Sequence, residues 1–339
     1  MAEGGRMPGL KNLTRRMTVA AVLLVSLPGL AAAETHRFKP DHFYTTYSFA
    51  HPPVLHIKPG DRVITETIDA YGRDSRDQLV LQGPNPETGP FYIEGAETGD
   101  TIVVTIHRIE PNRTTARSNT LLAPYTVDPG FLRSRAEREA RQETWIIDKA
   151  KGVARTSSDG LKPQSLEVPL VPMLGCVATA PARKEAIVSI APGPYGGNMD
   201  YAGMVAGVKL MLPVSEPGAL LFVGDGHARQ GHAEVVGTGL EVSMDVEFSV
   251  DLIKRKAIAW PRLDNQDYIM VLASERALLE AFQHATTELM LWLMSDYGFD
   301  ERTASMLLGQ AVEYEIANVV DPRFTVVAKI RKSMLPAAR

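Results

Sequence analysis

The sequence predicts a β-rich α+β protein: a β-sandwich or barrel-like body of mostly antiparallel strands, followed by a C-terminal helical segment. Short apolar runs of strand length alternate with Gly, Pro, Asp and Asn from residue 34 to about residue 270, a pattern typical of such bodies. Beyond residue 274 the apolar residues recur at helical spacing. The composition, 45% hydrophobic and 22% charged, is that of an ordinary globular protein.

The N-terminal segment, residues 1–33, has the three parts of a secretory signal peptide. A basic pair, Arg15-Arg16, precedes an apolar run over 17–30, and three alanines ending at Ala33 follow. The run is too short to span a bilayer of roughly 30 Å comfortably, so we expect cleavage after Ala33 and no membrane attachment afterwards. The basic pair also resembles a twin-arginine signal, and Sec export is equally compatible. We therefore expect the mature chain to be periplasmic or secreted.

The mature chain, residues 34–339, is long enough for one large domain or two smaller ones. Its net charge of -4 and pI near 6.1 give no electrostatic footprint for nucleic acid or an anionic membrane, so we expect neither as a partner. The single cysteine, Cys176, excludes an intrachain disulfide. Stability must therefore come from a sizeable apolar core.

Strand candidates follow one another through the β-rich part, 34–270. Each is an apolar or alternating run that ends near a turn signal such as Pro59-Gly60-Asp61 or Gly99-Asp100. The predicted strands cover 54–57, 62–68, 91–93, 101–106, 186–190, 209–212, 219–223 and 241–250. Between them, the charged stretch 133–142 indicates a short helix or loop insertion.

The segment 274–317 is predicted to be helical. A second helix within it is expected from Glu301 to about Ala317, with Asp300 as its N-cap, and a last strand at about 319–330. The first helix is indicated by apolar residues at helical spacing: Ala277, Leu278, Phe282, Ala285, Leu289 and Leu293.

The most informative stretch is the glycine-rich run 224–234, which directly follows a predicted strand. It contains Asp225, His227, His232 and Glu234, and its glycines allow the tight turns that bring such side chains together. Imidazole nitrogen and carboxylate oxygen are ligands of zinc and its neighbours. The run therefore indicates a metal or acid/base site, and the alternative is a solvated hairpin turn.

The chain resembles the acetamidase/formamidase family of amidohydrolases over most of its mature length, from about Val54 to Lys329. The resemblance rests on several segments in order: 59–61, 66–69, 85–100, 196–200, 212–214, 217–220, the 224–234 run and 319–322. It implies one hydrolase domain over 34–339, a jelly-roll-like β-sandwich with helices at one edge. It also implies hydrolysis of small linear amides such as formamide and acetamide to a carboxylate and ammonia.

Amide hydrolysis needs an activated nucleophile, a clamp on the developing oxyanion and an acid for the leaving amine, and a bound metal ion can supply the first two. His227, Asp225 and Asp200 are the expected ligands, with Asp69 as a fourth. Asp225 and His227 lie two residues apart, so on a strand end they would face the same side. Asp200 has the alternative of capping a helix. The mixture of Asp and His favours zinc or manganese, and we expect a divalent ion, with zinc as the first choice.

Glu234 or Glu94 could carry the proton that activates water and then protonates ammonia. Glu94 follows a predicted strand, where binding turn amides is an equal alternative. Asn198 could donate to the oxyanion, or serve only as a turn residue beside two glycines. Cys176 has apolar sequence neighbours that would raise the pKa of its thiol and make it inert. Ser75 is better explained as a loop residue than as a nucleophile.

Two departures from the family pattern affect the expected substrate more than the expected reaction class. Family members commonly carry Asp-Gly where this chain has His232-Ala233. The export signal is a second departure, because scavenging of small amides is usually cytoplasmic.

The competing hypothesis is a non-catalytic periplasmic protein that binds an amide or a metal on the same fold. A homo-oligomer is expected, since β-rich enzymes of this size often pair.

Overall fold

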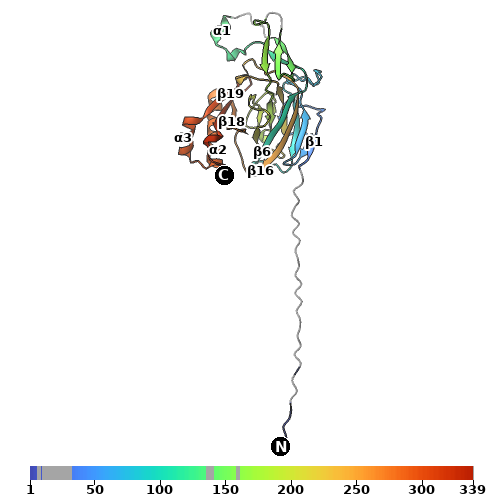
Figure 1. Cartoon of the computed structure of the whole chain (residues 1–339), viewed down its shortest axis with the longest axis vertical. Helices are drawn as coiled ribbons and strands as arrows, with labels where there is room; N and C mark the ends of the chain where they lie inside the picture. The colour runs from blue at the N-terminus through green and yellow to red at the C-terminus, as the bar shows by residue number, and fades with distance from the viewer. Residues whose placement is uncertain (6–8, 10–32, 135–140, 158–160, 339) are drawn as a thin grey trace. The chain divides into compact units, whose positions relative to one another are not determined.

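The computed structural model describes residues 1–5, 9, 33–134, 141–157 and 161–338 (Figure 1). Ala33–Arg339 form one compact unit, and Met1–Ala32 fall outside it. The expected signal peptide lies almost entirely outside the described residues, so it stays a prediction. Within the described part of the chain, no helix is long and apolar enough to cross a membrane.

The largest sheet has nine strands, and every neighbouring pair in it is antiparallel except β1 and β4. The interior strand β16 alternates buried apolar residues with partly exposed polar ones over most of its length, as expected for a strand that has one face on the core. In spatial order the strands are β1 (Thr35–Arg37), β4 (Arg62–Glu66), β16 (Met244–Ile253), β6 (Thr101–Pro111), β14 (Lys209–Pro213), β17 (Arg262–Asp264), β18 (Tyr268–Glu275), β20 (Phe324–Arg331) and β19 (Glu313–Asn318).

A five-stranded sheet carries most of the polar residues of interest. Its middle strands are buried along their whole length, and several of its core residues belong to the same apolar cluster as core residues of the large sheet. For example, Phe91 and Phe248 meet edge to face across the two sheets, with ring centroids 5.4 Å apart. The strands are β13 (Gly196–Asn198), β11 (Met173–Ala178), β15 (Leu221–His227), β5 (Glu87–Ile93) and β3 (Leu55–Ile57).

Among the described residues, two smaller sheets and three 3-10 turns complete the β-rich part, and a fourth turn follows β20. The four-stranded sheet falls where the sequence predicted no strands, because its strands mix Thr, Arg and Glu with few apolar residues. Its strands are β10 (Leu166–Pro169), β9 (Val153–Thr156), β8 (Gln142–Asp148) and β7 (Thr115–Asn119), and β12 (Ala186–Val188) pairs with β2 (Thr46–Ser48). The 3-10 turns are η1 (Pro124–Thr126), η2 (Ala182–Lys184), η3 (His232–Glu234) and η4 (Lys332–Met334).

The predicted insertion at 133–142 is only partly described, because residues 135–140 lie outside the described residues. Before it, α1 (Pro129–Arg133) is a helix of five residues. Asp128 caps α1 by accepting hydrogen bonds from the backbone N–H groups of Gly130 and Phe131.

The C-terminal helical segment consists of α2 (Leu278–Tyr297) and α3 (Glu301–Ala311), which pack together beside β18 (Figure 1). Asp300 is the N-cap of α3, as predicted, and accepts a hydrogen bond of 2.7 Å from the Thr303 N–H. The predicted extension of this helix to about Ala317 is wrong, because α3 ends at Ala311. Val312 follows, and residues 313–316 then alternate acidic and larger side chains with a period of two, so Glu313–Asn318 form β19 instead. The chain therefore ends in two paired strands, β19 and β20, where one was expected at 319–330.

The buried face of α2 is rotated from the predicted stripe. Ala285, Leu289 and Leu293 are fully buried as expected, whereas Leu278 and Phe282 remain 38% and 39% exposed. Glu288 and Trp292 lie on the buried face instead. The Glu288 carboxylate is paired there with a buried arginine of β17, so the polar side chain at this position fits inside because it has a charged partner.

Candidate active site

The glycine-rich run continues β15 rather than ending it, so Asp225 and His227 lie on the strand itself. Their side chains face the same side, as the two-residue spacing predicted, with His227 Nε2 3.3 Å from Asp225 Oδ1. A Cβ at Gly224 would collide with the buried Glu87 carboxylate, and one at Gly226 with Met244. The two glycines therefore let neighbouring strands approach β15 closely, and the polar residues between them are held inside the protein.

The His227 imidazole lies in a fully buried polar environment. Its Nδ1 is 2.8 Å from Gln230 Oε1, and its Nε2 is 3.0 Å from Glu241 Oε1. Burial opposes a charged imidazole, but the carboxylates of Glu241 and Asp225 outweigh it and hold the pKa of His227 well above its usual value. His227 thus stands between acidic groups that need a positive partner.

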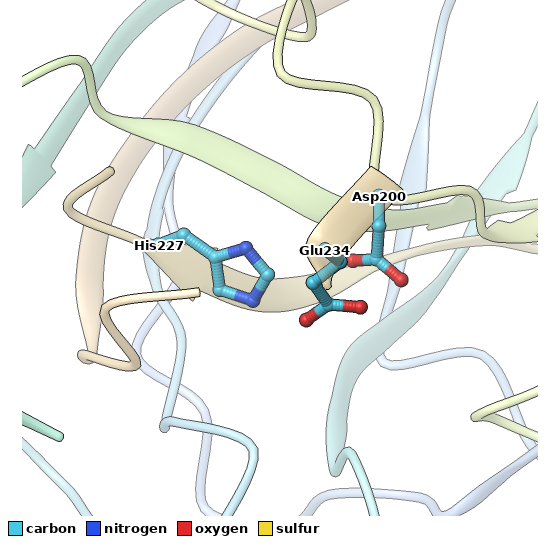
Figure 2. Close-up of side chains that lie close together, drawn as sticks. All are labelled: Asp200, His227 and Glu234. Atoms are coloured by element: carbon cyan, nitrogen blue, oxygen red, sulfur yellow. The ribbon is translucent and has the colours of Figure 1, made fainter. Parts of the chain in front are cut away.

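Asp200 and Glu234 approach the same imidazole from the other side, and Figure 2 shows both carboxylates facing the His227 ring. Asp200 is fully buried and Glu234 is 7% exposed, and burial raises the pKa of both well above the usual range. Asp200 has a φ of 45° and no helix follows it, so it does not cap a helix, the alternative that the sequence left open.

The buried acids and His227 form two overlapping groups of possible metal ligands. One consists of Asp200, His227 and Glu234, and the other of Asp225, His227 and Glu241. Within each group the ligand atoms all lie within 4.8 Å of one another. Because both groups include His227, it is the central residue of the site.

Sequence reasoning missed Glu241 and Asp321, which come from distant parts of the chain. Glu241 lies just before β16 and meets His227 through an isolated bridge between the two backbones. Asp321 follows β19, and its carboxylate accepts hydrogen bonds of 2.6 and 2.8 Å from the amides of Asn198 and Asn318. Both acids lie in segments that the sequence had already singled out, but for strand pattern or family resemblance rather than for their charge.

Asn198 and Cys176 face each other across β13 and β11, at the edge of the site. Asn198 Oδ1 accepts from the Cys176 thiol at 2.8 Å and from the Asn85 amide at 3.0 Å. Burial, followed by the nearby carboxylates of Glu87 and Asp225, raises the pKa of Cys176, in the direction expected from the sequence. The cause differs in part, because the thiol has polar and acidic neighbours in space where the sequence suggested only apolar ones.

The structure does not bring Asp69 or Glu94 into either ligand group. Asp69 is fully buried and ion-paired with Arg113, and it also accepts hydrogen bonds of 3.0 and 2.8 Å from the Tyr71 and Arg73 N–H groups. Glu94 follows the last residue of β5, on the surface, 2.8 Å from His56. At about 3.3 Å per residue, it lies roughly 20 Å along the chain from the first residue of β5, which adjoins the site.

His232 and Ala233, which replace the family's common Asp-Gly, form part of the turn η3. His232 is exposed and belongs to neither ligand group. Ala233 has φ of 66°, a conformation that glycine adopts freely and that costs other residues about 1 kcal/mol. The replacement therefore changes the strain of the turn that presents Glu234, rather than the set of possible ligands.

A cavity of about 450 Å³ opens onto these acids. Its acidic lining residues are Asp225, Glu234, Glu241 and Asp321, and no Lys or Arg is among the residues that line it. Tyr71 also lines the cavity, and burial and the neighbouring Glu241 raise the pKa of its phenol, which therefore stays protonated and can donate a hydrogen bond. A small polar molecule that enters would meet carboxylates on several sides and one phenol donor.

Gly175 provides a test of how tightly the acids are held. A Cβ at this position would lie within 3 Å of both Asp225 Oδ2 and Asp200 Oδ1. Gly175→Ala is therefore expected to displace both carboxylates and to lower the rate of any reaction at this site by about 100-fold, as misplacement by 1 Å can. The measurement is turnover beside melting temperature, with Gly309→Ala in α3 as the matched control, because a Cβ there meets nothing within 4 Å. Equal turnover by the two variants would contradict the expectation.

Comparison with known proteins places the chain in a family. It belongs to the Acetamidase/Formamidase family, whose model matches residues 40–185 and 181–335. It is similar to the crystal structure of an acetamidase from Yersinia enterocolitica, with 31% identity and a TM-score of 0.76 over 90% of this chain and 94% of that one. It is also similar to an acetamidase from Bacillus halodurans, with 28% identity and a TM-score of 0.76 over 88% of this chain and 98% of that one.

Among curated proteins, the chain is 25% identical to a formamidase from Methylophilus methylotrophus over 256 residues. The match covers 60% of this chain and 62% of that protein. The chain thus spans somewhat less than two thirds of the length of this curated relative.

Proposed function

We propose that this chain is a metal-dependent amidohydrolase that cleaves small linear amides, of the formamide and acetamide class, to a carboxylate and ammonia. The family and its named acetamidases and formamidase support the reaction class. The observation that carries the proposal is the pair of overlapping acid and histidine groups that meet at His227, beside a cavity large enough for a small amide.

The donor set fits a divalent cation. Asp200 Oδ1 and Glu241 Oε2 are buried carboxylate oxygens that have no hydrogen-bond partner among the described residues. Buried carboxylate oxygens normally have a partner, and a cation bound in the ligand group of either residue would provide one. Aspartate, glutamate and histidine donors together favour zinc or manganese over magnesium or calcium, and zinc is our first choice. Such an ion supplies Lewis acidity to the amide carbonyl and offsets the negative charge of the site.

The chain's own residues have separate tasks in this proposal. Gln230 orients His227 through Nδ1, and it also donates a 2.5 Å hydrogen bond to the Asp200 backbone carbonyl. Glu234, whose pKa is raised by burial, can take a proton from the attacking water and return it to the departing ammonia. The phenol of Tyr71 is a protonated donor on the cavity wall that can hydrogen-bond the substrate oxygen.

Removal of the metal is the first test. Purified mature protein is treated with a chelator, and ammonia release from formamide and acetamide is measured before and after Zn²⁺ is added back. We expect release to fall to the uncatalysed level on chelation and to return with the ion. Full activity in a sample shown by elemental analysis to hold no metal would contradict metal dependence and leave a carboxylate mechanism.

The non-catalytic alternative is distinguished by the same experiment, because saturable binding of an amide or a metal without any ammonia release would favour it. The binding-protein hypothesis was based on the His232-Ala233 replacement, and His232 lies outside both ligand groups. The structure therefore offers no observation that favours the binding protein over the enzyme.

Three further expectations belong to this proposal. The export signal predicted over 1–33 would make the enzyme periplasmic or secreted, which fractionation of cells that express the full chain would test.

We also propose that the mature chain forms a homo-oligomer, and measurement of its mass in solution by light scattering would test this. Finally, we propose that the nine- and five-stranded sheets form a jelly-roll-like sandwich around their shared core.

A further inference from the structure

A second cavity, of about 410 Å³, adjoins the acidic one. The two cavities have Gly237 and Asp321 in common as lining residues, so they lie next to each other. We call the second cavity the annex. Each cavity alone is within the size range of pockets for drug-sized ligands, about 300–1,000 Å³, so the two together far exceed what formamide or acetamide needs.

The annex is built from three chain segments that hydrogen bonds hold together. The Ala123 N–H donates to the Val235 carbonyl at 2.8 Å, and the Asn119 amide donates to the Val236 carbonyl at 3.1 Å. The Tyr125 hydroxyl donates to the Val320 carbonyl at 2.9 Å. These bonds join the segment around η1 to the other two walls and fix the shape of the cavity.

Two of the annex walls continue directly from residues of the acidic site. The segment 235–237 follows Glu234, and Val320 precedes Asp321. The wall of the annex is therefore continuous along the chain with two acids of the acidic cavity, Glu234 and Asp321.

The annex has a single charged lining residue, Asp321, where the acidic cavity has four. Its other lining residues are Asn119, Tyr125, a glycine and a set of apolar residues. The apolar lining residues are Leu121, Leu122, Ala123, Pro124, Val236 and Val320. Burying methylene groups against such a lining is favourable, whereas a charged group would lose hydration there.

We propose that the annex binds the apolar acyl chain of a primary amide, so that the preferred substrate is a linear aliphatic amide of several carbons rather than formamide or acetamide. This inference rests on the proposed function. Because the proposed reaction releases ammonia, the nitrogen side of the substrate carries no substituent. The apolar group that the annex accommodates must therefore be on the acyl side.

The test measures kcat/KM for ammonia release from acetamide, butyramide and hexanamide by the metal-loaded protein. Each methylene that enters the annex should raise kcat/KM by about two- to fourfold, the fold-change expected for partial to full burial of a methylene. Ala123→Trp fills the annex and should reduce the ratio of hexanamide to acetamide activity at least tenfold. Ala337→Trp, which adds the same side chain near the C-terminus, is the matched control and should leave that ratio unchanged.

Each outcome decides between the annex and the proposed function. A kcat/KM that does not rise with chain length, or a ratio that Ala123→Trp leaves unchanged, would overturn the annex while acetamide turnover upholds the amidase. Failure to release ammonia from any of the three amides would overturn the proposed function itself. If Ala123→Trp does not fold, as judged by its melting temperature, Leu121→Ala provides the second test, since losing the lining side chain should also lower the hexanamide to acetamide ratio.

Discussion

Glu234→Gln is expected to lower kcat for amide hydrolysis by about 10²–10⁴-fold without removing the metal. Glutamine has the same shape as Glu234 but cannot accept a proton, and the Asp225, His227 and Glu241 group keeps all its ligands in this variant. The expected result is a folded, metal-containing protein with unchanged amide binding and slow turnover. Metal content by elemental analysis and steady-state ammonia release are the two measurements.

His227→Gln is the matched comparison, because His227 belongs to both ligand groups. This variant should lose metal and activity together, whereas Glu234→Gln should lose activity alone. If both variants lose metal equally, Glu234 is a ligand and the proton must be carried by another group. If Glu234→Gln retains full activity, Glu234 is neither a metal ligand nor the proton carrier.

The parts of the site that sequence reasoning predicted are those governed by local spacing. Alternation along a strand predicts that Asp225 and His227 face the same side, and they do. The same reasoning cannot say which residues of other strands face them. Glu241 and Asp321 are brought to the site by the way the strands are ordered in the sheets, which joins segments far apart in the sequence. Neither carries a local signal that separates it from an ordinary surface acid.

Asp69 and Glu94 were predicted from local pattern to belong to the site, and the structure brings neither into a ligand group. Both follow apolar runs beside turn residues, which is also how Asp225 is placed in the sequence. What separates them is the partner in space, which is Arg113 for Asp69 and the exposed His56 for Glu94. Charge neutralisation by a residue 44 positions away is invisible to local pattern.

Strands were predictable where apolar runs end in turn residues. They were missed where the strands are polar, or where the spacing of side chains changes from a helical to a two-residue period. The runs at 101–106 and 209–212 became β6 and β14, which pair with each other. The strands β7 to β10 lack that apolar signal, and their positions depend on pairing with one another. The end of α3 was misplaced because the prediction extended the helix into β19, where the side chains already alternate with a two-residue period.

Arg113→Met should be the most destabilising single substitution considered, by about 3–5 kcal/mol, because it leaves the buried Asp69 carboxylate without its charged partner. Both side chains of this pair are at most 4% exposed, so water cannot replace the lost partner. Thermal unfolding should show the midpoint lowered by roughly 5–15 °C. Arg62→Met is the matched control, since its ion pair with Glu247 is 44% exposed on the arginine side and should contribute less than about 1 kcal/mol.

The same variant separates the two roles considered for Asp69. If Asp69 only anchors the segment that carries Tyr71, Arg113→Met should keep its full metal content at temperatures well below its unfolding midpoint. The double variant with Asp69→Asn should then recover part of the lost stability, because the unpaired buried charge is gone. A double variant that is more stable but holds less metal than Arg113→Met would show that Asp69 contributes to metal binding after all. A midpoint for Arg113→Met equal to that of Arg62→Met would contradict the buried ion pair itself.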